Sequence, residues 1–394
     1  MDVLLTCWPP QPDERMKFSL ICSSVTSSSC IRARRRRCFS SETVNRIMLA
    51  MITRQQGNAK RLFRGACKRR TLVLLCAAMR VSIIIPVKPG GRVRALEPLE
   101  RLHPGSPDFE IIVAEGKKPS RQRNQGAEAA AGDILYFLDD DSLVEPDALQ
   151  RLERLFADPG VAAVGGPSVT PRSDSSFQRS VGWALASLLG GGAIRNRYRR
   201  SGSVRKTGDN ELILCNLAFR REQYLAAGGL NEKLYPNEEN ELIDRLLASG
   251  ARLLHDPDLF VTRSQRPTLK AYVRQMLTYG RGRAEQTLLT RTIGFKALLP
   301  GLFSLYILSL PFAPGLWYLM PLFLYLAAIV ASMAAAAAVI GISPALCLPL
   351  VYFLLHFCYG TGFITGLFQP RYRGAGDAEQ PVTLRRVREF ARGR

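Results

Sequence analysis

The sequence contains no Asp, Glu, Lys or Arg between Lys296 and Arg371, a run of 74 residues in which His356 is the only imidazole. An uncharged run of this length excludes a water-exposed segment and predicts helices that cross a membrane. At 1.5 Å per residue, a continuous helix over this run would extend about 110 Å, enough for three crossings of a hydrocarbon core about 30 Å thick.

Proline and glycine divide this run. Residues 311–315 separate a first span from a second, and residues 341–344 separate the second from a third. The first span is short and contains Pro300, so a position in the membrane interface is the alternative for it. Within a transmembrane region over residues 297–368, we expect spans near 297–313, 316–340 and 345–368.

Cations flank the uncharged run on both sides, and positive charge marks the cytoplasmic side of a membrane. Both the juxtamembrane amphipathic segment 266–296 and the basic tail 369–394 are therefore expected there. Two cytoplasmic ends require an even number of crossings, which conflicts with three spans, so two to four stay open, with three preferred. The flanking cations include Arg274, Arg281, Arg283, Arg291 and Lys296 before the run and Arg371, Arg373, Arg385, Arg386 and Arg388 after it.

Cysteine is scarce outside the first 78 residues, which hold six of the nine. The other three, Cys215, Cys347 and Cys358, have no spacing typical of disulfides or metal sites. Residues 1–78 also lack hydrophobic periodicity and carry 15 Lys and Arg against 4 Asp and Glu, a net charge of +11. We expect this basic extension to be disordered.

The extension ends at Met79, which is followed at once by the strand-like pattern "RVSIIIPV". This favours Met79 as the true start of the protein, with a nucleic-acid-binding arm or a targeting segment as the alternatives. Aromatic residues do not alternate with the basic ones as they do on surfaces that bind single-stranded nucleic acid, so we expect no nucleic acid partner.

Residues 79–265 alternate between strand-like and helix-like patterns, which predicts a layered α/β domain. Buried strands are expected at 80–87, at 109–116 and across "DILYFLDDD", whose apolar run suits a strand covered on both faces. A helix is expected from an N-cap at Ser120 to a stop at Gly132.

Three adjacent aspartates, Asp139, Asp140 and Asp141, follow the third strand at its carboxyl end, where ligands bind in open α/β sheets. Adjacent carboxylates hinder one another's ionisation unless a cation shares the site. Alternation along an extended chain places Asp139 and Asp141 on one side. Two carboxylates there are hard oxygen ligands for Mg²⁺ or Mn²⁺, completed by waters and substrate phosphates. A turn or a helix cap is the alternative, but it explains one aspartate rather than three.

Arg121 and Arg123 fall in the first turn of the predicted helix, where the helix dipole disfavours cations by some tenths of a kcal/mol. A phosphate or pyrophosphate bound at this helix N-terminus would offset that cost, because backbone N–H groups and arginines bind anions together. Solvated arginines are the alternative.

The segments of this domain resemble the family 2 glycosyltransferases with a GT-A fold in their order and spacing. The resemblance covers roughly residues 80–265 and implies a Rossmann-like domain with a mixed, mostly parallel sheet. The later "RQMLTYGRGRAEQT", followed by membrane spans, is similar to the membrane-associated bacterial branch that makes exopolysaccharide of the succinoglycan type. The segments that carry the resemblance are "VSIIIPV", "FEIIVAEG", "RNQGAEAAAGDILYFLDDDS", "CNLAFRREQYLAAGGLNE" and "YPNEENELIDRL".

The resemblance implies a role for each of several residues. Asp139 and Asp141 match the metal-binding aspartates, with Mn or Mg as the cofactor. Glu238 and Glu239 match the family's acidic pair, with Glu239 in the position of the general base, although Glu replaces the usual Asp there. Capping by Asn237 and a favourable helix dipole are the alternative for these glutamates. Contacts to the nucleotide sugar are implied at Pro86, Val87, Glu115, Arg121, Arg123, Asn124, Asp139 and Asp140.

The chain also departs from the family pattern. Lys88 and Pro89 replace the usual Tyr or Asn after "PV", and "AEG" at 114–116 replaces "DDGS". The resemblance implies that these positions contact the base of the nucleotide. UDP is therefore the expected nucleotide, with GDP left open. The "QxxRW" of processive synthases is absent, because "RSQRP" at 263–267 has no Trp. This indicates addition of one sugar rather than a polymer.

Two basic stretches are candidates for contacts to an acceptor or a diphosphate. The first, "RNRYRRSGSVRK", contains Arg197, Arg199 and Arg200, and the second, "TYGRGRAEQT", contains Arg281 and Arg283. Solvated loops, or a signal for membrane topology, are the alternatives.

The sequence therefore predicts an inverting glycosyltransferase of the bacterial inner membrane, multi-pass, with its catalytic domain in the cytoplasm. The expected partners are a nucleotide-sugar donor, a lipid-linked saccharide acceptor and other proteins of a polysaccharide pathway. A transferase acting on polyprenyl phosphate, which needs no strong base, and a non-catalytic membrane scaffold that keeps the fold are the alternatives.

Overall fold

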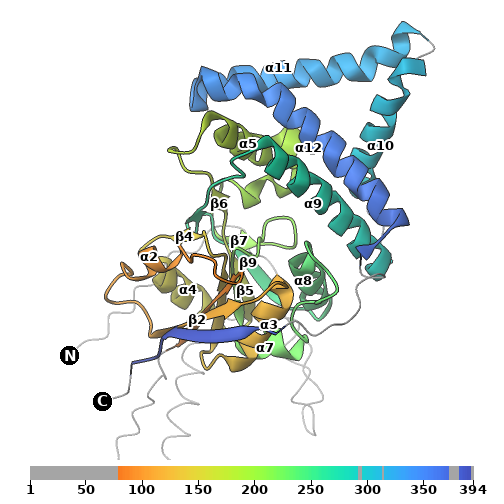
Figure 1. Ribbon diagram of the computed structural model, residues 1–394. Coiled ribbons are helices and arrows are strands. Elements are labelled where there is room, and N and C mark those ends of the chain that lie inside the picture. Colours follow the sequence, from red (N-terminus) through yellow and green to blue (C-terminus); the bar gives the residue numbers. More distant parts are fainter. Residues whose placement is uncertain (1–78, 292–294, 313–314, 372–380, 392–394) are drawn as a thin grey trace, which may run out of the picture. The chain divides into compact units, whose positions relative to one another are not determined.

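The computed structural model describes residues 79–291, 295–312, 315–371 and 381–391 (Figure 1). The first 78 residues, and with them the predicted disordered extension, lie outside this range.

An eight-stranded mixed sheet forms the α/β part of the described chain, in the order β11-β2-β1-β3-β8-β5-β9-β7. Five strands run in one direction: β1 (Val81–Val87), β2 (Phe109–Glu115), β3 (Ile134–Leu138), β5 (Val161–Gly165) and β9 (Arg252–His255). Three run in the opposite direction: β7 (Arg205–Lys206), β8 (Asn216–Arg220) and β11 (Thr383–Arg388). The expected mixed, mostly parallel α/β sheet is confirmed.

Side chains of the central strands alternate between two buried cores, as the pleat requires. Ile83 and Ile85 of β1 pack with helices α2 (Leu96–Leu99) and α4 (Ala148–Phe156). Ile84 points to the opposite face and packs with α7 (Arg221–Ala226) and α8 (Glu238–Ala248). Coverage on both faces explains why the strands read as continuous apolar runs rather than as alternating ones.

The helix that follows β2 is α3 (Pro119–Ala129), and its N-cap lies two residues earlier than expected. Lys118 lies at the N-cap position and Pro119 takes the first helical turn, where its fixed φ angle fits. The predicted N-cap, Ser120, is therefore wrong: its buried hydroxyl donates to the carbonyl of Leu234.

A second, three-stranded sheet in the order β4-β10-β6 lies beside the predicted ligand-binding edge. It contains β4 (Leu143–Val144), β6 (Ser168–Val169) and β10 (Val261–Thr262). Thr262 pairs antiparallel with Leu143, so the residue after β10 lies next to the residues before β4. This register brings Arg263 to the aspartates.

Apolar helices follow the α/β domain. Among the described residues, two are long and apolar enough to cross a membrane, Leu316–Ile340 and Ile342–Phe368, while the apolar helix Leu298–Phe312 is shorter. The helical elements of this part and of its contacts are α5 (Ser176–Ala186), α6 (Leu188–Gly191), η1 (Gly192–Arg197), α9 (Leu269–Thr290), α10 (Phe295–Ser309), η2 (Leu310–Phe312), η3 (Leu316–Leu319), α11 (Met320–Ile340) and α12 (Ile342–Phe368).

Helices α9 and α12 run side by side (Figure 1). Glycine permits their close approach, because a Cβ atom on Gly280 would collide with the carbonyl of Tyr359, and one on Gly362 with the carbonyl of Leu277. Small residues at such contacts are typical of helix pairs in membrane proteins.

The basic tail adds the edge strand β11, which pairs antiparallel with β2 (Figure 1). Arg386 Nη1 lies 2.9 Å from Glu110 Oε2, and Glu110 is fully buried. Glu110 also accepts hydrogen bonds from the Ser82 hydroxyl and the Ala131 N–H, each at 2.7 Å. The guanidinium of Arg388 lies 3.7 Å from the centroid of the Phe109 ring. Part of the basic tail is therefore an element of the sheet.

We expect Arg386→Ala to lower the free energy of unfolding by about 1–3 kcal/mol, because the buried Glu110 carboxylate would lose its cation while keeping two neutral donors. Arg385→Ala on the same strand is the matched control and should change stability by less than about 0.5 kcal/mol. Thermal unfolding of the detergent-solubilised protein measures both. Equal effects of the two substitutions would contradict a role for the ion pair.

Candidate functional site

A pocket of about 520 Å³ lies at the carboxyl ends of β1, β2 and β3, within the volume range of small-molecule sites. Pro86 and Val87 line it at the end of β1, and Gly116 and Lys117 line it after β2. The remaining walls come from α3, the start of α8, η1, α9 and α12. The α/β domain and the apolar helices thus share one pocket.

Asp139 and Asp141 face a common cation in this pocket. Arg263 Nη2 lies 3.1 Å from Asp139 Oδ2, and Arg263 Nε donates to Asp141 Oδ1 at 2.5 Å. Arg123 Nη2 donates to the second oxygen of Asp139, also at 2.5 Å. Asp139 and Asp141 thus both contact one guanidinium. The divalent ion expected at this pair stays a prediction.

The three aspartates have different electrostatic surroundings. Burial by itself raises the pKa of Asp139, but the charges of Arg263 and Arg123 hold that pKa below its ordinary value. The pKa of Asp140 is raised, by burial first and then by the charges of Asp141 and Asp139. The cluster is therefore tolerated because two arginines neutralise its outer members.

Glu238 and Glu239 begin α8 and both line the pocket. The side chain of Glu238 is 4% exposed and lies 3.6 Å from Arg123 Nη1, while that of Glu239 is 12% exposed and lies 3.6 Å from Arg197 Nη1. Burial, followed by the charge of Glu239, raises the pKa of Glu238 to about 8. Within the described chain, Glu238 Oε2 has no hydrogen-bond partner. Burial thus favours the protonated form of Glu238 at neutral pH.

Asn237 occupies the N-cap position of α8, but its side chain does not cap the helix. Its φ angle is 84°, in the left-handed region, and its Oδ1 accepts from Asn240 Nδ2 at 2.8 Å. The capping explanation for the two glutamates is therefore weakened, since the residue that it needs bonds elsewhere.

The pocket extends from the aspartates to helices α9 and α12. Tyr279 and Arg283 of α9 and Tyr359 of α12 line its far side, together with Tyr198. Arg197, which is 6% exposed, is held there by Asn240 Oδ1 at 2.5 Å. Two guanidinium groups, those of Arg197 and Arg283, therefore lie in the part of the pocket that contains Glu239.

The structure brings most of the predicted site residues together and leaves others outside the pocket lining. Those that line it are Pro86, Val87, Arg123, Asp139, Asp140, Asp141, Arg197, Glu238, Glu239 and Arg283. Those that lie outside it are Glu115, Arg121, Asn124, Arg199, Arg200 and Arg281.

Two residues outside the lining support the pocket walls. Glu115 Oε1 accepts from the N–H of Gly90 at 3.2 Å, which ties the loop after β1 to β2. Asn124 bonds both the N–H and the carbonyl of Leu230, each at 2.9 Å, and so holds the chain that leads to α8. Both side chains position neighbouring segments.

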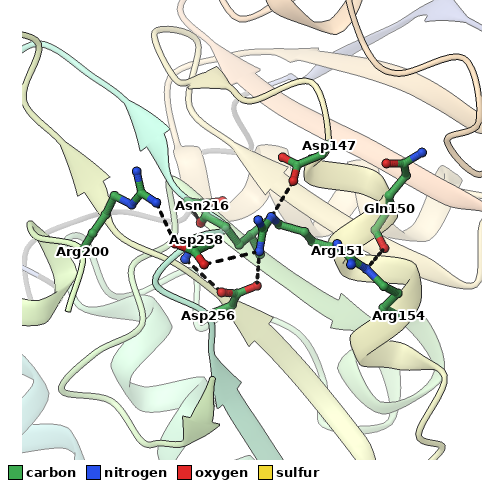
Figure 2. A network of polar contacts seen from close by, with 9 residues as sticks. Asp147, Gln150, Arg151, Arg154, Arg200, Asn216, Asp256 and Asp258 are labelled. Atoms are coloured by element: carbon green, nitrogen blue, oxygen red, sulfur yellow. Dashed lines mark hydrogen bonds and ion pairs between the residues drawn. The ribbon is translucent and has the colours of Figure 1, made fainter. Parts of the chain in front are cut away.

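Figure 2 shows why Arg200 does not reach the pocket. Its Nη2 lies 2.7 Å from Asp258 Oδ1, and Arg151 Nη1 lies 3.8 Å from the other oxygen of the same carboxylate. Arg151 also donates to Asp256 at 3.5 Å. This network fastens the basic loop to α4 and to the turn after β9, away from the aspartates.

Arg263, Arg266 and Lys88 line the pocket but were not among the predicted site residues. Arg263 and Arg266 lie in "RSQRP", which the sequence offered only as evidence against a processive motif. The available signal is Arg263 directly after the strand-like "LFVT", with Arg266 three positions later. The contact of Arg263 with Asp141, however, depends on the pairing of β10 with β4.

The oxygens of Asp139 and Asp141 fit a divalent ion, because one guanidinium already reaches both of them. No cluster of three His, Cys, Asp or Glu side chains that could hold a metal occurs among the described residues. Mg²⁺ or Mn²⁺ at this place would therefore depend on waters and substrate phosphates for the rest of its shell, as is usual for Mg²⁺ bound with phosphates.

The fold and the pocket define the class of Rossmann-like α/β proteins that bind ligands beyond the carboxyl ends of their strands. Residues 83–223 match the family model described as Glycosyl transferase family 2. This part of the chain is therefore a family 2 glycosyltransferase domain, as its sequence resemblance implied.

The chain is also similar to proteins that have assigned names. "Pre-mycofactocin glycosyltransferase" of Mycobacterium tuberculosis is 28% identical over 174 residues, which cover 44% of this chain and only 36% of that protein. "Succinoglycan biosynthesis protein ExoA" of Rhizobium meliloti is 26% identical over 252 residues, which cover 55% of this chain and 73% of that protein. Among solved structures, mannosyltransferase PcManGT from Pyrobaculum calidifontis, in complex with GDP-Man and Mn²⁺, matches with a TM-score of 0.43 and 14% identity over 79% of this chain and 93% of that chain.

Proposed function

We propose that the protein is an inverting, metal-dependent glycosyltransferase that moves a sugar from a nucleotide-sugar donor, expected to be a UDP-sugar, to a lipid-linked saccharide. One observation carries this proposal: a single pocket contains the aspartate pair, a carboxylate of α8 and several arginines. The relationship to a succinoglycan biosynthesis protein supports a place in the synthesis of an envelope or extracellular polysaccharide.

The proposed mechanism assigns a task to each side of the pocket. Glu239 takes the proton of the acceptor hydroxyl while the hydroxyl oxygen attacks the anomeric carbon in line with the leaving diphosphate, which inverts the configuration. Arg123 and Arg263 supply positive charge at the aspartates, where the diphosphate departs. A divalent ion held by Asp139 and Asp141 would add further charge stabilisation for the same leaving group.

The far side of the pocket supports a lipid-linked acceptor. Tyr359 belongs to α12, one of the two helices long and apolar enough to cross a membrane, and it lines the same pocket as Glu239. An acceptor carried by a lipid in the bilayer would therefore reach the site along a membrane helix.

The chain enters and leaves the apolar helices at the α/β domain, which supports an even number of crossings. Arg371, after α12, lies 3.1 Å from Glu285 of α9, which precedes the apolar helices. Strand β11 then joins the main sheet. We propose two crossings, by the helices 316–340 and 342–368, with the catalytic domain on the cytoplasmic side of a bacterial inner membrane.

The proposal is tested by titrating the detergent-solubilised protein with UDP and GDP, each with and without Mn²⁺, beside Asp141→Asn. We expect one nucleotide to bind in the presence of Mn²⁺ and the substitution to weaken that binding by more than about tenfold, since it removes a carboxylate ligand of the metal. Isothermal titration calorimetry measures the affinities. Absence of nucleotide binding under all four conditions would favour a scaffold that keeps only the fold.

The arginines around Glu239 favour a second candidate, transfer to a polyprenyl phosphate. Arg197 and Arg283 both line the acceptor side, and a phosphate acceptor would be attracted by their charge. A phosphate oxygen is already ionised at neutral pH, so this reaction needs no general base.

A further inference from the structure

Arg263 occupies the place between Asp139 and Asp141 where a divalent ion would bind. We infer that Arg263 is an internal counterion that competes with the metal for these two carboxylates and gives them up only when the donor diphosphate arrives. This inference rests on the proposed function, because it describes how the same site controls its own metal.

The contacts define the competition atom by atom. The guanidinium of Arg263 contacts Asp139 Oδ2 with its Nη2 and Asp141 Oδ1 with its Nε. A metal ion held by both aspartates would need oxygens from this same pair. Both cations cannot use the same lone pairs at once.

The two aspartates already have counterions without a metal. Arg123 and Arg263 place two guanidinium groups against the carboxylates of Asp139 and Asp141. A divalent ion added alone would meet two guanidinium groups at short range, which is repulsive in a half-buried site. The diphosphate of a donor brings the negative charge that compensates the ion.

Arg263 has both an anchor and room to move. Its backbone N–H donates to the carbonyl of Val169 at 3.0 Å, which fixes the main chain beside β6. Its side chain is 21% exposed and faces the pocket of about 520 Å³. The guanidinium can therefore turn from the aspartates to a bound diphosphate, for which its fork geometry is suited, without any change in the sheet.

This arrangement makes the metal dependent on the donor. While Arg263 holds the pair, only the small fraction of molecules with free aspartates binds a metal ion, and the apparent affinity falls by that fraction. Because coupling between two ligands is reciprocal, the nucleotide must then raise the affinity for the metal by as much as the metal raises the affinity for the nucleotide.

The test is a titration of the full-length protein with Mn²⁺ alone, without nucleotide, in which the free ion is counted by electron paramagnetic resonance. We expect Arg263→Gln to bind Mn²⁺ roughly tenfold or more tightly than the unchanged protein, because the competitor is removed. Arg263→Lys should give a smaller gain, since a point charge remains but the bidentate fork does not. The double variant Arg263→Gln, Asp141→Asn should lose the gain.

Arg266→Gln is the matched control, because it removes one positive charge from the same pocket at a residue that, in the described chain, forms no ion pair with Asp139 or Asp141. Arg266→Gln should change the affinity for Mn²⁺ by less than about threefold, since it alters only a charge at longer range. An equal gain of Mn²⁺ affinity in Arg263→Gln and Arg266→Gln would overturn the proposed competition, because the loss of any positive charge in the pocket would then explain the result. No gain in Arg263→Gln, with circular dichroism unchanged, would overturn it as well.

The two failures are distinguishable. If Arg263→Gln gains no affinity for Mn²⁺ while the unchanged protein binds UDP or GDP with Mn²⁺, the proposed function stands and the counterion role of Arg263 is wrong. If no nucleotide binds but Arg263→Gln gains affinity for Mn²⁺, the competition stands at a site that does not serve a nucleotide sugar.

Discussion

Glu239→Gln is expected to lower the rate of sugar transfer by about 10²–10⁴-fold while leaving the binding of the donor nucleotide within about threefold. General-base catalysis contributes an effect of this size, and an amide cannot accept the acceptor's proton. The substitution keeps the shape of the side chain beside Arg197. Transfer of radiolabelled sugar to membrane lipids measures the rate, and calorimetric titration measures the nucleotide.

Glu238→Gln is the matched control for this prediction. Glu238 is buried, and its raised pKa of about 8 keeps it largely protonated at neutral pH. An amide resembles the protonated carboxyl in shape and charge, so transfer should fall by less than about tenfold at pH 7. A severe loss in Glu238→Gln with little loss in Glu239→Gln would exchange the two roles. Full activity in both variants would favour a phosphate acceptor, which needs no base.

Arg123→Gln is expected to lower the free energy of unfolding by about 3 kcal/mol and to weaken nucleotide binding. The Arg123 side chain is only 5% exposed and lies against Asp139 and Glu238. Removal of one partner of a buried ion pair costs about 3–5 kcal/mol, and the lower end applies because Asp139 keeps Arg263. A fall of roughly 5–10 °C in the melting temperature follows for a domain of this size.

The comparison variant is Arg121→Gln, two positions earlier on the same helix and outside the pocket lining. It should leave nucleotide affinity within about threefold. Comparable losses of nucleotide affinity in both variants would show that the start of α3, rather than Arg123 itself, attracts the diphosphate. Differential scanning fluorimetry and nucleotide titration separate the stability effect from the binding effect.

The aspartates show which part of the site could be predicted from the sequence. Their place at the end of a buried strand and their alternation are local properties, and these led directly to Asp139 and Asp141 on one side of the chain. Arg263 lies 122 positions from Asp141, and only the pairing of β10 with β4 brings the two together. Local patterns contain no information about that pairing.

The fold shows the same division. The ends of strands β1 and β2 were predicted to within one residue and those of β3 to within three, because continuous apolar runs between turn residues are strong local signals. Strand β11 was not predicted. All six residues of "TLRRVR" are exposed, four of them are polar or charged, and they do not alternate regularly with apolar residues. Segment 383–388 forms a strand because it pairs with β2, not because of its own residue pattern.

The edge strand also has a consequence for the order in which the protein is completed. Arg386 meets Glu110 across 276 positions of sequence, and every apolar helix lies between them. During synthesis, the outer edge of β2 therefore stays unpaired until the helices have been made. The carboxylate of Glu110 has no arginine partner during that time. Unpaired edges template aggregation. Closure of the sheet by β11 can therefore occur only after all of these apolar helices have been synthesised.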